Sequence, residues 1–241
     1  MVRDHPDRTP GVHARTRTQA QSAVEKPAFT TRGRRAMSRQ YGCIAFTDDV
    51  RRVQEDYGSA EFYTRMAGQA HNTAAADPLG PREATFLEER DGFYLSTVSQ
   101  TGWPYVQFRG GPPGFVSVLD EHTVAWPEYR GNLQHVSTGN LAGNHRVAMI
   151  AIDYPRRRRL KLFGMARVVR AEDDPTLVSS LSSPRYDAVM EAAVVVSVTA
   201  YDWNCPQHIP RRFTLEQIEQ QLTPLRERIR ALEAQIEGQR S

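Results

Sequence analysis

Seven segments rich in Val, Ile, Tyr, Phe and Thr follow one another between residues 93 and 204, and most are bounded by Gly, Pro, Asp or Asn. Runs of this composition are typical of β-strands, and the residues between them are turn formers. Most connections are too short to hold a crossover helix, so neighbouring strands are expected to pair antiparallel. The sequence therefore predicts a mainly β (α+β) fold, an antiparallel sheet or barrel of six or seven strands. The segments are 93–99, 103–109, 114–120, 123–129, 146–153, 159–170 and 192–204.

Short helices are expected before the strands. Thr47 is a suitable N-cap for a helix in which Val50, Val53 and Tyr57 share one face. Pro81 opens a second helical stretch, because proline is favoured at the first position of a helix. These helices are predicted to cover the strands.

The C-terminal segment 213–241 has a different period. Thr214 and Gln217 fit a capping box, while Thr223 and Pro224 indicate a fresh helix start, so a bend or break is predicted there. The apolar residues recur at alternating spacings of three and four, which is typical of an amphipathic helix that packs on another surface. That surface is either a partner subunit or the protein's own body. The apolar positions are Leu215, Ile218, Leu222, Leu225, Ile229, Leu232 and Ile236.

The net charge of +3 comes from the N-terminal segment. Residues 1–36 hold eight of the 31 Lys and Arg residues but three of the 28 acids, which leaves 23 basic and 25 acidic residues from residue 37 onward. This nearly neutral body argues against nucleic-acid binding. Residues 1–36 lack apolar periodicity and are predicted to be a disordered basic extension.

Three further classes of protein are disfavoured. No apolar run approaches the roughly 20 residues of a membrane span, so no membrane association is expected. The two cysteines, Cys43 and Cys205, cannot form the framework of a secreted mini-domain, and a cytoplasmic location is expected. Cys205 and His208 lie three residues apart, but no second pair completes a zinc site, so no metal is expected.

A polar segment interrupts the strands between residues 126 and 140. The signatures of dinucleotide-binding, nucleoside-triphosphate-binding and serine-hydrolase sites are absent from the sequence. This segment instead gathers neutral hydrogen-bonding groups around one cation, an arrangement suited to a phosphate group. Arg109, at the end of a predicted strand, is a second cation that can join it. The candidate residues are Arg109, Arg130, Asn132, Gln134, Ser137, Thr138 and Asn140.

The order of three motifs resembles the pyridoxamine 5'-phosphate oxidase-like family of FMN-binding split β-barrels. The motifs are the turn "TGWPY" at 101–105, the segment "NLAGNHRVA" at 140–148 and the strand "LKLFGMA" at 160–166. The likeness spans about residues 80–170 and extends more loosely from residue 37 to residue 213. It implies a split β-barrel, bound FMN, and a homodimer with one flavin at each subunit boundary.

The resemblance also implies roles for single residues. Arg109 falls near a strand-end arginine that meets the FMN phosphate. Ser137 and Thr138 replace a basic pair, which shifts phosphate binding toward Arg130 and its neighbouring amides. Arg159 stands where a glutamine approaches the flavin, and Lys161 where an arginine faces the substrate, so pyridoxamine phosphate itself is not the expected substrate.

Strand alternation places Arg159 and Lys161 on one sheet face, expected to be the face of the cofactor. There they can stabilise negative charge on the reduced flavin or bind an acidic substrate. His135 and His145 are candidate acid–base groups only by their proximity to the polar segment.

The resulting prediction is an FMN-dependent oxidoreductase of unknown substrate. A deazaflavin or haem cofactor, or a flavin-binding protein without turnover, stays open as an alternative. The predicted domains are the extension 1–36, a split-barrel domain 37–212 and the C-terminal helix 213–241.

Overall fold

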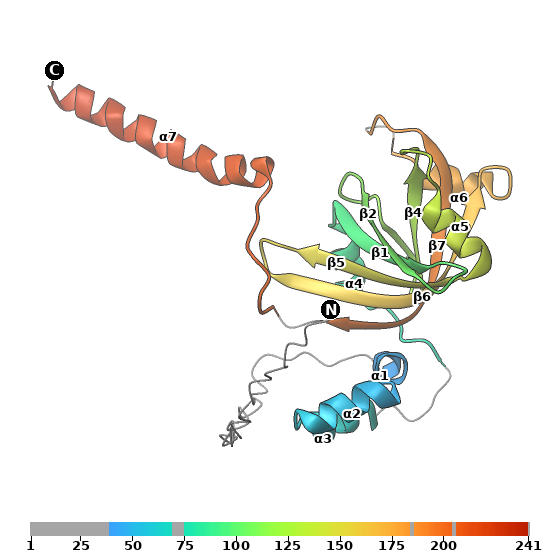
Figure 1. Ribbon diagram of the computed structural model, residues 1–241. Coiled ribbons are helices and arrows are strands. Elements are labelled where there is room, and N and C mark those ends of the chain that lie inside the picture. Colours follow the sequence, from blue (N-terminus) through green and yellow to red (C-terminus); the bar gives the residue numbers. More distant parts are fainter. Residues whose placement is uncertain (1–38, 69–74, 184–185, 204–205, 241) are drawn as a thin grey trace, which may run out of the picture. The chain divides into compact units, whose positions relative to one another are not determined.

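The computed structural model describes residues 39–240 except 69–74, 184–185 and 204–205. All the described residues belong to one compact unit. The predicted basic extension and Cys205 lie outside the described residues. Figure 1 shows the described residues as a ribbon, coloured from blue to red by their order along the chain.

All seven predicted strands are present in one antiparallel sheet, which confirms the predicted fold class. The order across the sheet is β2-β1-β5-β6-β7-β4-β3. The strands are β1 Gly92–Val98, β2 Pro104–Gly110, β3 Ser117–Asp120, β4 Thr123–Tyr129, β5 Arg146–Asp153, β6 Arg158–Arg170 and β7 Met190–Trp203.

The sheet curls until its two ends approach each other, although β2 and β3 are not hydrogen-bonded neighbours. Phe93 of β1 meets Trp126 of β4 edge-on, with ring centroids 4.9 Å apart. Arg109 of β2 and Glu128 of β4 form an ion pair of 2.9 Å across the same opening. The architecture is therefore an antiparallel barrel whose opening is bridged by side chains.

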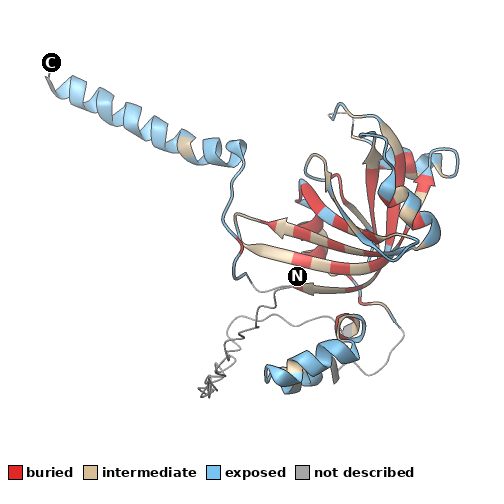
Figure 2. Ribbon diagram, in the orientation of Figure 1, coloured by how far each residue is buried: buried red, intermediate tan, exposed pale blue. Residues whose placement is uncertain are grey.

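The two faces of the sheet differ because side chains alternate along each strand. Leu95 pairs with Met149, which pairs with Leu162, and all three are buried in the main core. The next row holds Tyr94 and Ile150, which face outward. Figure 2 shows that buried residues concentrate in the strands.

Seven helices are described, and two of them confirm predicted caps. Thr47 caps α2 by accepting a hydrogen bond from the Val50 backbone at 3.4 Å, and Pro81 opens α4. The buried Glu83 of α4 accepts hydrogen bonds from the Gly80 backbone and from the Trp203 indole, at 3.2 and 2.5 Å, which ties α4 to β7. The helices are α1 Arg39–Ala45, α2 Asp48–Asp56, α3 Ala60–Gly68, α4 Pro81–Glu88, α5 Val136–Gly143, α6 Pro175–Ser180 and α7 Leu215–Arg240.

The sequence predicts a bend or a break at Pro224. Helix α7 continues through this residue, so the predicted break is wrong, while the predicted bend stays a prediction. The predicted capping box is confirmed, because Thr214 and Gln217 exchange backbone-to-side-chain hydrogen bonds of 3.1 and 3.2 Å. Among the described residues, no helix has the length and hydropathy to cross a bilayer.

Candidate functional site

A polar hollow of about 220 Å³ lies at the barrel opening. Strand β2 contributes alternate residues to it, the ones that face the barrel interior, and Arg109 stands opposite the core residue Phe93 in the sheet. The loop between β4 and α5 supplies the other side. The lining residues are Tyr105, Gln107, Arg109, Glu128, Tyr129, Glu191 and 131–136.

The ion pair between Arg109 and Glu128 dominates the electrostatics of the hollow. Each side chain is 15% exposed, so water screens the pair only weakly. Arg109 Nε and Glu128 Oε2 are buried and have no hydrogen-bond partner within the described part of the chain. These two buried polar atoms are groups that the donors and acceptors of a bound ligand could satisfy.

The pKa of Glu128 is raised above its ordinary value. Burial is the main cause, Glu191 adds to the rise, and Arg109 and His135 oppose it. Burial likewise raises the pKa of Tyr129, with a contribution from Tyr186. A raised carboxyl pKa means that the charged form of Glu128 is less favoured than that of an exposed glutamate.

The loop before α5 adopts an uncommon conformation. Leu133 and His135 have φ angles of 61° and 48°, in the left-handed region that non-glycine residues seldom occupy. Asn132 Oδ1 accepts a hydrogen bond of 3.2 Å from the Gln134 backbone, which stabilises the turn. The His135 side chain makes no hydrogen bond that caps α5, so the first-turn N–H groups have no such cap.

The predicted phosphate-binding residues therefore separate into two groups. Arg109, Asn132 and Gln134 line the hollow. Arg130 is not among the lining residues, and its Nε donates to Glu191 Oε1 at 2.8 Å.

The predicted residues of α5 hold the helix in place instead. The Ser137 hydroxyl donates to Gln107 Oε1 at 3.3 Å, and Asn140 Nδ2 donates to Thr97 Oγ1 at 3.0 Å. Thr138 is half-buried and does not line the hollow. These hydrogen bonds anchor α5 on β2 and β1.

Arg159 and Lys161 lie on the outer face of the sheet, because they alternate with the buried Leu160 and Leu162 of β6. Their shared face is confirmed, but it is the face opposite to that of Arg109. Within one copy they are not brought to the hollow. Lys161 Nζ contacts the Tyr41 hydroxyl at 2.6 Å and Asp202 at 3.4 Å.

Several residues that line the hollow were not among those predicted from the sequence. Tyr105 and Gln107 share the inward face of β2 with Arg109, and strand alternation alone indicates this. Glu128 and Glu191 carried no comparable signal, because they reach the hollow only through the curl of the sheet. Of the two candidate histidines, His135 lines the hollow and His145 does not.

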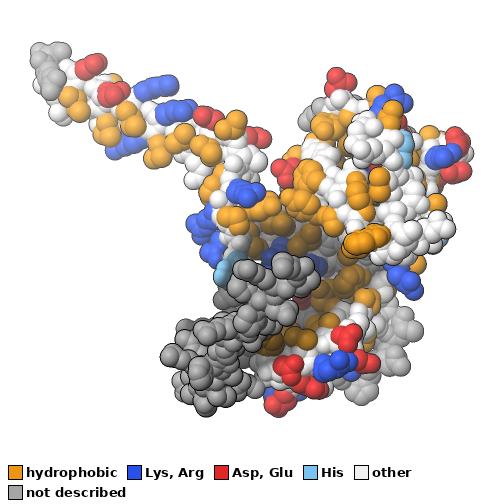
Figure 3. Space-filling view, viewed as in Figure 1, with side chains coloured by type: hydrophobic (Ala, Val, Ile, Leu, Met, Phe, Trp, Pro, Cys, Tyr) orange, Lys and Arg blue, Asp and Glu red, His pale blue; other side chains and the backbone are white. Residues whose placement is uncertain are grey.

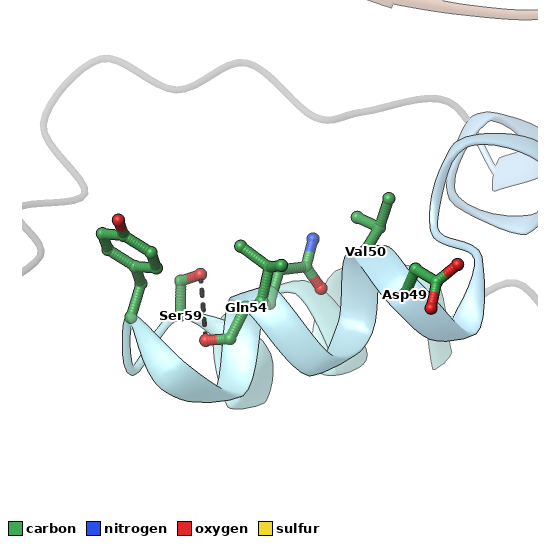
Figure 4. Close-up of a pocket in the computed structure, with 6 residues that line it drawn as sticks. Asp49, Val50, Gln54 and Ser59 are labelled. Carbon is green, nitrogen blue, oxygen red and sulfur yellow. Dashed lines mark hydrogen bonds between the residues drawn. The ribbon is translucent and has the colours of Figure 1, made fainter. Parts of the chain in front are cut away.

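A second hollow, of about 410 Å³, lies along α2 (Figure 4). It confirms that Val50, Val53 and Tyr57 share one face, but Tyr57 is 80% exposed. The polar contact drawn in the figure joins the Ser59 hydroxyl to the Gln54 carbonyl at 3.4 Å. Asp49 is the charged residue among those that line it, so this hollow does not suit an anion.

No group of three or more His, Cys, Asp and Glu side chains suited to a metal ion exists among the residues that the structure describes. The predicted absence of a metal site therefore stays a prediction for the chain as a whole, since Cys205 lies outside those residues.

Comparison with protein families gives one match. The family model described as pyridoxamine 5'-phosphate oxidase matches residues 79–204, which contain the strands and the polar hollow. No protein with curated annotation matches the sequence.

Solved structures resemble the fold at low sequence identity. HupZ of Group A Streptococcus is 15% identical, covers 56% of this chain and 100% of its own, and has a TM-score of 0.43. A candidate pyridoxamine 5'-phosphate oxidase from Lactobacillus delbrueckii is 22% identical, with coverages of 54% and 95% and a TM-score of 0.40. An FMN-binding protein from Syntrophomonas wolfei is 8% identical, with coverages of 52% and 85% and a TM-score of 0.40.

Proposed function

Because the chain belongs to the pyridoxamine 5'-phosphate oxidase family, we propose that it is an FMN-dependent oxidoreductase that holds the FMN phosphate at the polar hollow. The observation that carries this proposal is the largely enclosed Arg109 side chain, whose buried Nε has no hydrogen-bond partner among the described residues. A guanidinium is the side chain best suited to bidentate contact with a phosphate. Bound FMN supplies an acceptor for a hydride or for single electrons.

The residues of the hollow have separate tasks in this proposal. Arg109 binds phosphate oxygens, and the Asn132 and Gln134 side chains donate further hydrogen bonds. The backbone N–H groups at the start of α5 add a partial positive charge. Glu128 competes with the phosphate for Arg109 when it is ionised, so phosphate binding is coupled to proton uptake by its carboxyl group.

The size of the hollow suggests that one copy provides only part of the site. About 220 Å³ suits a phosphate and part of a ribityl chain, whereas pockets that enclose a whole drug-sized ligand measure roughly 300–1,000 Å³. The flavin ring therefore needs a further surface, and we propose that a second copy of the chain supplies it.

The outer sheet face supports this homodimer. Phe108 and Tyr94 pack edge-on there, and they are 55% and 39% exposed, while Val106 is 60% exposed. Apolar clusters of this kind are uncommon on the surface of a monomer. Arg159 faces outward from the same sheet, so Arg159 of the partner subunit is a candidate contact to the first copy's flavin. Lys161, by contrast, is already held by Tyr41 and Asp202.

The primary experiment measures FMN binding to the purified full-length chain. Arg109→Ala is expected to weaken it by about 1.5–3 kcal/mol, the size of one charge-assisted hydrogen bond. This corresponds to roughly tenfold or more in Kd. Arg51→Ala, which removes an exposed arginine on α2, is the control and should leave the affinity unchanged.

Arg109→Ala also leaves Glu128 buried without its partner, which can impair folding by itself. The double variant Arg109→Gln with Glu128→Gln removes both charges, so no unpaired carboxylate stays at the site. Its loss of FMN affinity relative to Glu128→Gln alone reports on the Arg109 guanidinium. Affinity equal to that of Glu128→Gln in the folded double variant would remove Arg109 from the site.

Turnover is tested on the flavin-loaded protein. Bleaching of the bound flavin by a nicotinamide donor, followed by recovery with oxygen or an added acceptor, is expected of an oxidoreductase. Retained colour without a redox response would identify a flavin-binding protein without turnover. Co-purification of a deazaflavin or haem would replace FMN as the cofactor.

A further inference from the structure

Helix α7 carries an apolar stripe that is not covered. From Leu215 to Gln239 every residue is exposed except Leu222, which is half-buried. The apolar side chains between Leu215 and Ile236 form the stripe, called the α7 seam below, and Ile229 is 55% exposed. Figure 3 shows hydrophobic side chains distributed along this helix.

The α7 seam has the repeat of a coiled coil. Its seven residues are separated by three and four positions in strict alternation from Leu215 to Ile236. This repeat of 3.5 residues keeps a seam facing a partner helix when two helices wind around each other in a left-handed sense. An isolated helix gains most of its stability from packing of its apolar face, so an uncovered seam of this length calls for a partner.

We propose that α7 pairs with α7 of a second copy of this chain in a parallel, two-stranded coiled coil. In the usual heptad letters, the a positions hold Leu in the first half of the seam and Ile in the second, at Ile229 and Ile236, while the d positions are Ile218, Leu225 and Leu232. Isoleucine at a with leucine at d favours parallel pairs of helices. The preference for a parallel pair therefore comes from the second half, Leu225 to Ile236. The proposal concerns α7 alone and does not depend on FMN binding.

The charges beside the seam fit the same arrangement. Arg228 occupies a g position and Glu233 the e position five residues later, so in a parallel pair each Arg228 faces the partner's Glu233. The other g positions in the seam, Gln221 and Gln235, are neutral. Arg226 pairs with Glu219 of its own helix at 2.6 Å.

In one antiparallel register these charges repel. If Leu222 lay opposite the partner's Leu232, which covers most of the seam, Glu219 would face the partner's Glu233. Arg226 would then face the partner's Arg226. Like charges at such positions repel, and the parallel pair avoids both contacts.

Pro224 is also compatible with a coiled coil, because it falls at a c position, away from the seam. The proline removes one helical hydrogen bond, but its ring does not enter the interface between the two helices.

Disulfide crosslinking of the full-length chain tests the pairing. In a Cys43→Ser, Cys205→Ser background, Leu232→Cys places a thiol at a d position, where it meets its own copy in a parallel pair. Ala234→Cys places the matched control thiol at an f position on the opposite side of the helix. Mild oxidation should give covalent dimers of Leu232→Cys and few of Ala234→Cys, as measured by non-reducing electrophoresis.

Exchanging the charges beside the seam distinguishes stable pairing of two α7 helices from disulfides that form through random encounters. Arg228→Glu should lower the crosslinking equilibrium of Leu232→Cys on the order of tenfold, since two attractive pairs become repulsive. Adding Glu233→Arg should restore it. Equal crosslinking of the two thiols, or none of either, would overturn the proposal. A disulfide that forms between Leu222→Cys and Leu232→Cys chains, but not between two Leu232→Cys chains, would overturn the parallel orientation.

Discussion

At the scale of single residues, the ion pair between Arg109 and Glu128 has two effects: it stabilises both charges, and it competes with a phosphate for Arg109. Its 2.9 Å contact satisfies part of two buried charges. The same contact occupies the cation that a phosphate would need. Since burial raises the pKa of Glu128, protonation of this carboxyl group is the least costly way to release Arg109.

The first prediction concerns Glu128→Gln. Because the amide is neutral, it should bind FMN more tightly than the wild type at neutral pH, by roughly tenfold if one buried charge contact is relieved. Below the raised pKa of Glu128 the two proteins should have the same affinity, and the difference should grow as pH rises. Calorimetric titrations with FMN at several pH values measure this. Equal affinity throughout would mean that Glu128 does not compete.

The raised pKa of Glu128 also determines how the free energy of unfolding changes with pH. A carboxyl group whose folded pKa is raised contributes stability that is fully present below its unfolded pKa, ordinarily 4.5, and is lost as pH rises through the folded pKa. The free energy of unfolding should therefore decline over that window in the wild type and less so in Glu128→Gln.

At the scale of elements, the register between β6 and β7 depends on Gly164. A Cβ atom at this position would lie 2.5 Å from Val196 Cγ1 and 2.6 Å from the Ser197 carbonyl oxygen. Gly164 also stands at the shift in register between the two strands. No side chain fits without moving the backbone of β7.

The second prediction is that Gly164→Ala destabilises the protein by about 1–3 kcal/mol, the usual cost of overpacking. Gly139→Ala is the matched control, because nothing lies within 4 Å of its added Cβ in α5. Alanine there should be neutral or stabilise by up to about 1 kcal/mol. Denaturant unfolding of the two variants measures the contrast, and a loss of stability in both would point away from the contact with β7.

Local patterns explain why the strands and caps were predictable from sequence. Val124, Ala125 and Trp126 form a buried β-type run, and Thr47 with Thr214 are caps whose partners lie three residues away. The continuity of α7 at Pro224 was not predictable in this way. A proline costs a helix about 3 kcal/mol, and whether the neighbouring turns offset that cost depends on the whole helix.

At the scale of the whole molecule, the contents of the site depend on curvature. Arg109 and Arg159 both follow from strand motifs, but the sequence did not indicate that they would face opposite sides of the sheet. Glu128 meets Arg109 only because strands at nearly opposite ends of the sheet order come together. Helix or strand periodicity does not predict such contacts, because the residues that they join are far apart in the sequence.

The third prediction tests the proposed homodimer. Phe108→Asp places a charge on the outer apolar face and should weaken FMN binding while the barrel stays folded. In an Arg228→Glu background, where pairing of α7 is weakened, it should also shift the protein toward monomers. Leu119→Asp, at an exposed position of β3 near the other sheet edge, is the control. Analytical ultracentrifugation with flavin titration measures both effects. In the Arg228→Glu background, a Phe108→Asp protein that dimerises like the control would locate the subunit contact elsewhere.

Strands β2 and β3 lie at the two ends of the sheet and are not joined by hydrogen bonds. Elsewhere around the barrel, separating two strands requires a ladder of backbone hydrogen bonds to break, whereas at this edge the ion pair of Arg109 and Glu128 spans the gap. The barrel is therefore expected to open most easily between β2 and β3, next to the hollow where a ligand is proposed to bind.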